Sequence, residues 1–271
     1  MLTTSVLRTH LLAAGLAGAV ATTRERSLRR HRLFAARDPR ALLGLEPEHP
    51  WSVPQLLALM AGACGACPDP GRRDGRETID PALTVSALDA FADRLALAAA
   101  RRAPVLFGTG HPRSLLPFYA GLAAALAAAG CPVLTPGYGR CIEVTTRFGV
   151  RPYTMSYVRG VALVREAGAA CAPGAPGAHT HSPLPVRVAL AAAAGAGGPL
   201  PALVIGDHGW LCGAGQLGFD AMGPADADDP AAFVGQAEGR VSLAVPLDDA
   251  LRPGAYRMLT RYVLNRACLS Q

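Results

Sequence analysis

The sequence predicts an α/β fold, in which a parallel, Rossmann-like sheet has helices on both faces and the N-terminus adds a helical extension. From about residue 103 onward, short apolar runs alternate with longer amphipathic stretches, which is the pattern of successive β-α units. The first hundred residues instead have mostly helical apolar spacing. With 51% hydrophobic and 17% charged residues, the chain can bury a sizeable core. We therefore expect a helical region, 1–102, packed on an α/β core, 103–271, as one structural unit.

In the helical region, apolar spacing predicts helices over 5–21 and 28–45. Ser52 is a suitable N-cap for a third helix that runs to about residue 63. A polar loop over 67–80 then leads to a long amphipathic helix over 84–101.

In the core, apolar runs bounded by turn residues predict strands, and the longer stretches between them predict helices. The expected strands are 104–107, 131–134, 160–164, 203–205 and 241–245, and the expected helices lie in 114–129, 183–194 and 253–268. The first two strands are about 25 residues apart, which implies a right-handed crossover and parallel pairing. Ligands of such sheets bind outside the carboxyl ends of the strands.

The first polar loop at a strand end is Gly108-Thr109-Gly110-His111. Its glycines would let the backbone approach a ligand, and a following helix would offer free N–H groups to an anion. We therefore predict that Gly108, Thr109 and Gly110 bind a phosphate, with Arg113 as an added cation and His111 as a donor or base. A tight turn without a ligand is the alternative.

The second loop follows the apolar run 203–205 and begins Asp207-His208-Gly209. Such a pair can hold a divalent metal or serve as nucleophile, acid or base. The loop continues to Gly213, Gly215 and Gln216, which we expect to be a second glycine-rich start of a helix that binds an anion. The alternative is a buried aspartate that caps this helix beside an exposed histidine.

A third segment, His179-Thr180-His181, places two imidazoles on one face of an extended backbone, which suits metal ligation. If the three loops converge, His111, His179, His181 and His208 meet at one site, with His179, His181 and Asp207 as metal ligands. His10, His31 and His49 are expected on the surface of the helical region. Asp226, Asp228 and Asp229 are expected to cap a helix, although a metal could use Asp226.

A basic segment over 24–32 contributes to the net charge of +6 and contains Arg24, which could neutralise an anionic substrate. Glu25 could join the site if the N-terminal helices fold over the sheet edge. A solvated helix face is the alternative for this segment. It has no interleaved aromatic residues, so we expect no nucleic-acid partner.

The run 11–21 has the outline of a signal peptide, but it is short and the residues after it are densely basic. No apolar run reaches the roughly 18 residues that span a membrane. Seven scattered cysteines do not form a disulfide framework. We therefore expect a cytoplasmic protein with no membrane partner, and a homodimer is compatible with the sequence.

Several motifs together carry a resemblance to a known family. They are Ala21-Thr22-Thr23-Arg24-Glu25, Thr78-Ile79-Asp80-Pro81, Thr109-Gly110-His111-Pro112, His179-Thr180-His181-Ser182-Pro183, Asp207-His208-Gly209-Trp210 with 213–216, Asp228-Asp229-Pro230 and Val245-Pro246-Leu247-Asp248-Asp249. Across most of its length the chain resembles a family of actinobacterial proteins known simply as phosphatases. The chain departs from the family pattern at Thr23, where members tend to carry Pro, and at Arg26 and Ser27, where they tend to carry Asn. If those Asn residues bind a ligand, the substrate or activity has diverged here.

The resemblance implies hydrolysis of a small phosphomonoester, and the histidines and Asp207 suggest dependence on a divalent cation such as Mg²⁺, Mn²⁺ or Zn²⁺. Two alternatives stay open at this point. One is a metal-free isomerase, lyase or cyclase that acts on an anionic small molecule, and the other is a non-catalytic protein that binds a phosphorylated ligand.

Overall fold

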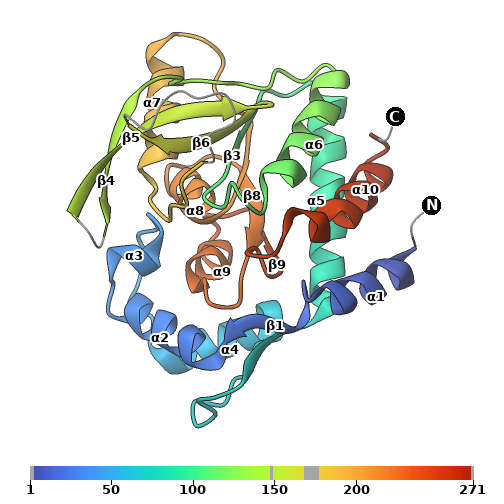
Figure 1. Cartoon of the computed structure of the whole chain (residues 1–271), viewed down its shortest axis with the longest axis vertical. Helices are drawn as coiled ribbons and strands as arrows, with labels where there is room; N and C mark the ends of the chain where they lie inside the picture. The colour runs from blue at the N-terminus through green and yellow to red at the C-terminus, as the bar shows by residue number, and fades with distance from the viewer. Residues whose placement is uncertain (1–2, 147–148, 168–176, 270–271) are drawn as a thin grey trace.

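The computed structural model describes residues 3–146, 149–167 and 177–269, and it has the expected α/β architecture around one mixed sheet (Figure 1). The spatial order of the sheet is β4-β5-β6-β3-β7-β8-β9. Its strands are β3 (Val105–Gly108), β4 (Cys141–Thr146), β5 (Gly149–Val158), β6 (Val161–Glu166), β7 (Leu203–Gly206), β8 (Ala221–Ala225) and β9 (Leu243–Pro246). The five strands from β6 to β9 are parallel, and β5 pairs antiparallel with both β4 and β6.

The parallel strands are short, and most of their residues are buried because helices cover both faces of the sheet. The predicted strands at 104–107, 160–164, 203–205 and 241–245 are confirmed as β3, β6, β7 and β9. The predicted strand at 131–134 is wrong, since Val133 makes a single bridge to Val105 there. β4, β5 and β8 were not predicted. The sequence of β8, Ala-Met-Gly-Pro-Ala, lacks β-branched residues and so gives no strand signal.

Two groups of three helices cover the sheet (Figure 1). On one side lie α5 (Pro81–Ala100), α6 (Leu116–Ala128) and α10 (Arg257–Arg266), the last preceded by the 3₁₀ turn η1 (Pro253–Tyr256). On the other side lie α7 (Leu184–Gly195), α8 (His208–Gln216) and α9 (Pro230–Ala237). The predicted helices at 114–129 and 183–194 correspond to α6 and α7, and 253–268 contains η1 and α10.

The N-terminal region is less helical than expected, because it contains a two-stranded antiparallel sheet. Its elements are α1 (Thr4–Ala14), β1 (Gly18–Thr23), α2 (Arg24–Ala35), α3 (Pro39–Leu42), α4 (Val53–Cys64) and β2 (Arg76–Ile79). The predicted helix over 5–21 is wrong after residue 14, where Gly15 takes a left-handed conformation, φ +74°, and ends α1. The predicted cap at Ser52 is confirmed by a capping box with Gln55.

Hydrogen bonds attach the N-terminal region to the α/β core. The Asp248 N–H donates to the Leu16 carbonyl at 2.9 Å, and the Ala21 N–H donates to Asp248 Oδ2 at 3.1 Å. α2 and α4 also pack on α9. The six cysteines that the structure describes are all unpaired, as expected, and Cys171 lies outside the described residues. Within the described residues, no helix is long and apolar enough to cross a membrane.

The chain order creates a switch point beside β3. The chain adds β6 on one side of β3, and then crosses over through α7 to add β7 on the other side. Connections that leave neighbouring strands in opposite directions open a crevice above the carboxyl ends of those strands. The functional side chains lie at this end of the sheet.

Candidate functional site

Four histidines from three separate segments gather above the carboxyl ends of β3, β6 and β7. We call His111, His179, His181 and His208 the histidine cluster. One ring nitrogen of each lies within 4.8 Å of the corresponding atom of every other. His208 Nε2 is 2.7 Å from His111 Nδ1, and the rings of His181 and His208 stack with centroids 4.0 Å apart. The expected convergence of the three loops is confirmed.

The turn after β3 positions His111 and does not offer a phosphate cradle. The Thr109 N–H donates to the Ala162 carbonyl, the Gly110 N–H donates to Asp207 Oδ2, and the His111 N–H donates to Thr109 Oγ1. These donors are therefore already engaged within the protein. A β-carbon on Gly110 would lie 2.3 Å from the Thr180 carbonyl oxygen, so glycine is needed for close backbone packing. The N–H groups of Thr109 and Gly110 are therefore not available to a phosphate, and the predicted phosphate site could draw only on the start of the following helix.

His208 begins α8 in the left-handed backbone region, with φ +49°. Residues that carry a β-carbon seldom adopt this conformation, and where they do, it often marks a functional site. The next residue packs against the third loop, because a β-carbon on Gly209 would lie 2.3 Å from the Ser182 carbonyl oxygen. The start of α8 therefore lies close to the segment that carries His181, whose ring stacks on the ring of His208.

Asp207 is completely buried behind His111. Its Oδ2 lies 3.3 Å from His111 Nδ1 and accepts the Gly110 N–H at 3.0 Å. Burial opposes ionisation, but the hydrogen bond from His111 and the charge of His208 lower the pKa of Asp207. We predicted that Asp207 is a metal ligand or a nucleophile. Its geometry fits better with a role in orienting the His111 ring.

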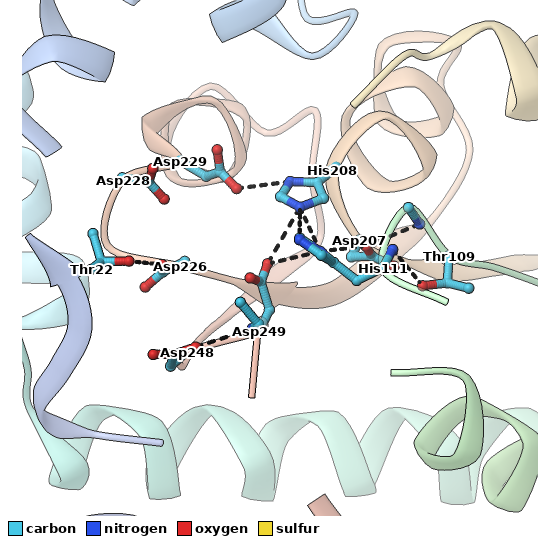
Figure 2. A network of polar contacts seen from close by, with 12 residues as sticks. Thr22, Thr109, His111, Asp207, His208, Asp226, Asp228, Asp229, Asp248 and Asp249 are labelled. Carbon is cyan, nitrogen blue, oxygen red and sulfur yellow. Dashed lines mark hydrogen bonds and ion pairs between the residues drawn. The ribbon is translucent and has the colours of Figure 1, made fainter. Parts of the chain in front are cut away.

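Two other carboxylates extend the histidine cluster on the side of β8 and β9 (Figure 2). Asp229 Oδ2 lies 2.8 Å from His208 Nδ1. Asp249 Oδ2 lies 3.5 Å from His208 Nε2 and 3.6 Å from His111 Nδ1. Sequence reasoning assigned Asp229 to a helix cap, but its side chain caps nothing at the start of α9. Asp249 was not predicted as a site residue, and its place after the β9 strand was the available signal.

Burial and nearby charges shift the pKa values of the histidines and aspartates in the site. Burial lowers the pKa of His179 to about 4 and that of His181 well below its ordinary value, which favours neutral, ligating imidazoles. Burial also opposes the charged form of His208, but Asp229 outweighs it and raises the pKa of His208. The same pair lowers the pKa of Asp229, whereas burial raises that of Asp249 far above its usual range.

A second layer of polar contacts surrounds Asp229 and its neighbours. Arg30 Nη2 donates to Asp229 Oδ1 at 2.8 Å, and Arg26 Nε donates to Asp228 Oδ2 at 2.5 Å. Thr22 donates a short hydrogen bond to Asp226 (Figure 2). Arg30 is nearly buried, whereas the side chain of Arg26 is 52% exposed. The basic segment therefore faces the carboxylates of the site through Arg26 and Arg30.

Arg24 and Glu25 do not join the site. The Arg24 guanidinium is buried, pairs with Glu77 at 2.7 Å and donates to the carbonyls of Asp69 and Arg72. It holds α2 to β2 and to the loop before β2, so the prediction that it neutralises substrate charge is wrong. Glu25 is exposed in the first turn of α2, where a carboxylate favours the helix dipole.

Gly213, Gly215 and Gln216 lie in the last turns of α8 and not at the start of a helix, so their predicted anion site has no free helix end. A β-carbon on Gly213 would lie 2.9 Å from Pro183, which explains the glycine as a helix-packing residue. Gln216 Oε1 accepts the Glu46 N–H. Arg113 is exposed, and its role in binding substrate stays a prediction.

The three remaining histidines lie outside the cluster. His49 is exposed and stacks on Trp51, and His10 contacts the Ala255 carbonyl at 2.7 Å. His31 was expected on the surface but is completely buried. Its helix face packs beside Arg24, which periodicity alone did not reveal.

A cavity of about 760 Å³ opens next to the histidine cluster. It is lined by Asp38, Pro39, Arg40, Val144, Thr145 and the segment from His179 to Leu184. Among these lining residues, Asp38 pairs with Arg40 at 2.6 Å. This volume falls in the range of small-molecule sites. A ligand that contacts His179 and His181 can therefore extend toward β4 and α3.

Comparison of the sequence with known proteins identifies a family. The curated protein named "Phosphatase SCO2771", from Streptomyces coelicolor, is 42% identical over 265 residues, which cover 97% of this chain and 95% of that protein. A sequence model of the family described as Phosphatase matches residues 2–271. Streptomyces is an actinobacterium, so both findings agree with the resemblance seen in the motifs. The chain belongs to the Phosphatase family.

Proposed function

We propose that this protein hydrolyses a small phosphomonoester with the help of a divalent cation held at the histidine cluster. Family membership supports the phosphatase chemistry. The proposal of a bound cation depends on one observation: four imidazole nitrogens lie within 4.8 Å of one another. Neutral imidazoles are common ligands of Zn²⁺ and other transition metals, and the lowered pKa values of His179 and His181 favour the neutral form.

A divalent cation supplies two things to such a reaction: it polarises the phosphoryl group and it makes water a better nucleophile. In the hydrolysis, the water oxygen forms a new bond to phosphorus, the ester P–O bond breaks, and the alcohol leaves with the proton that the water has lost. Asp207 contributes by fixing the ring of His111 from behind. The adjoining cavity offers room for the organic part of the ester.

The test is phosphate release from a panel of aryl, sugar, nucleotide and amino-acid phosphates, each assayed with Mg²⁺, Mn²⁺, Zn²⁺ or EDTA. We expect release that depends on added metal and stops on chelation. His181→Ala should lower kcat by a factor of about 100 or more, while the exposed His49→Ala should match the wild type. Release that persists undiminished in EDTA would contradict the cation, and no release from any ester would contradict the hydrolysis.

A further inference from the structure

The histidine cluster continues into a second group of possible ligands, which shares His208 with it. His208, Asp229 and Asp249 also offer ligand atoms that lie within 4.8 Å of one another. Their side chains are at most 4% exposed. The three come from the ends of three adjacent parallel strands, β7, β8 and β9. Figure 2 shows Asp229 and Asp249 reaching His208 from different directions.

One carboxylate oxygen of Asp249 has no close hydrogen-bond partner among the described residues. This oxygen, Oδ2, is buried. The two imidazole nitrogens beside it are 3.5 and 3.6 Å away, which is too far for a normal hydrogen bond. A buried carboxylate without a partner is costly, so such groups are usually paired or bind metal. Asp229 Oδ1 accepts a hydrogen bond from Arg30, and Asp229 Oδ2 lies 2.8 Å from His208 Nδ1.

The ligand count favours two ions over one. Four imidazoles and two carboxylates exceed the four ligands of a tetrahedral site, and catalytic sites usually keep three protein ligands with one open position. Dividing the set at His208 leaves His111, His179 and His181 as one triad and His208, Asp229 and Asp249 as the other. Two-cation centres with ions 3.5–4 Å apart are a known solution for phosphoryl chemistry.

We propose that the site holds two divalent cations, one on His111, His179 and His181 and the other on His208, Asp229 and Asp249. This inference rests on the proposed function, since it adds an ion beside the first. The two positions differ in chemistry: the nitrogen-rich triad suits Zn²⁺ or a similar ion, whereas the triad with two carboxylates suits Mn²⁺ or Mg²⁺.

The experiment is a titration of the full-length, metal-stripped protein with Mn²⁺, read by calorimetry, metal analysis and electron paramagnetic resonance. We expect two equivalents per chain and a spin-coupled signal. Asp249→Ala should retain one equivalent with an uncoupled signal, and His181→Ala should lose the other equivalent. Asp220→Asn, at an exposed carboxylate that pairs with Arg94, should keep both. If Asp249→Ala does not fold, Asp249→Asn tests the same ion, with a Kd at least tenfold weaker.

The outcomes separate the two proposals because phosphate release is measured on the same samples. One equivalent in the wild type, or two tight equivalents retained in both Asp249 variants, would overturn the second cation. One equivalent together with chelator-sensitive phosphate release would leave the proposed function intact. Two equivalents with no phosphate release from any ester would support the two-cation site and remove the phosphatase assignment.

Discussion

At the scale of single residues, the site depends on how backbone geometry and buried carboxylates aim two imidazole rings. His208 takes a left-handed conformation at the start of α8, and Asp229 contacts its Nδ1 at 2.8 Å. Asp207 holds His111 from behind at 3.3 Å. Because carboxylates in this position fix the tautomer and orientation of a histidine, they affect its reactivity without touching the substrate.

Replacing Asp207 by Asn should lower kcat by about 10- to 100-fold, because the neutral amide holds the His111 ring less firmly. KM should change little, since Asp207 is completely buried and does not line the cavity. Steady-state kinetics of phosphate release would show this, with thermal unfolding as a check that the variant folds. A rise in KM at unchanged kcat would argue for direct contact with the substrate.

The buried His31 makes a separate prediction about pH. Burial, together with the charge of Arg24, lowers the pKa of His31 to about 4 in the folded protein. In the unfolded chain the pKa is about 6.5, so the unfolded state binds the proton first as the pH falls. The contribution of His31 to stability is therefore complete above about pH 6.5 and is lost progressively toward pH 4, by up to about 3 kcal/mol.

Urea unfolding between pH 4 and 7.5 would measure this dependence. His31→Gln should flatten the decline between pH 6.5 and 4, whereas His49→Gln, at an exposed histidine, should follow the wild-type curve. Identical slopes in the wild type and His31→Gln would show that other groups cause the acid sensitivity.

At the scale of elements, the N-terminal region is organised by one buried ion pair. Arg24 at the start of α2 pairs with Glu77 of β2, and both side chains are fully buried. Glu77 also accepts the N–H groups of Cys67 and Thr78. The pair therefore fixes α2 on the small sheet, and α2 in turn presents Arg26 and Arg30 to the carboxylates of the site.

Glu77→Gln should destabilise the protein by about 3–5 kcal/mol, because it leaves the Arg24 charge buried without a counter-charge. Chemical denaturation would measure the loss in free energy of unfolding. Asp220→Asn breaks an exposed pair with Arg94 and should cost less than about 1 kcal/mol. Equal effects of the two substitutions would contradict the structural role that we assign to Arg24.

The strand β4 gives the second prediction at this scale, because it forms one wall of the cavity through Val144 and Thr145. Thr145→Trp should raise KM for bulky esters by about tenfold while leaving small esters nearly unaffected. The change fills space on the side of the organic group and does not touch the histidine cluster. Glu143→Trp, on the same strand but outside the cavity lining, is the matched control. A uniform effect on all esters would place the substrate elsewhere.

At the scale of the whole molecule, residues from all five parallel strand ends meet at one place. His111 follows β3, His179 and His181 follow β6, His208 follows β7, and the two carboxylates follow β8 and β9. A cation bound there would connect segments that are far apart in the sequence. Since the ion binds only the folded arrangement, it would stabilise the whole domain by mass action.

Adding Mn²⁺ or Zn²⁺ at about 100 times its Kd should therefore stabilise the folded protein by about 2.7 kcal/mol. For a domain of roughly this size, each kcal/mol raises Tm by about 2–4 °C, so a shift of about 5–10 °C is expected. Differential scanning fluorimetry with and without EDTA would detect it. In a variant that combines His181→Ala with Asp249→Ala, the shift should disappear, and a shift that survives would place the ion at another site.

The sequence alone was sufficient for the order β3, α6, α7 and β7, because buried parallel strands leave short apolar runs between turn residues. It also predicted the four histidines of the cluster: His111 and His208 come soon after two such strands, and His179 and His181 have the His-x-His spacing that places both rings on one face of an extended backbone. Capping of α4 by Ser52 was likewise local, because one side chain bonds to a backbone group three residues later.

Only the tertiary structure decided which polar groups complete the site and which support the fold. Asp249 and His111 are 138 positions apart and meet because β9 and β3 run parallel in one sheet, an order that no local pattern encodes. The burial of Arg24 depends in the same way on β2, more than 50 residues further along the chain. Local sequence determines the backbone preference and the hydrophobic face of each element, whereas charge pairing across the fold depends on the strand order. In this protein, that order separates Arg24 from the site and brings Asp229 and Asp249 to His208.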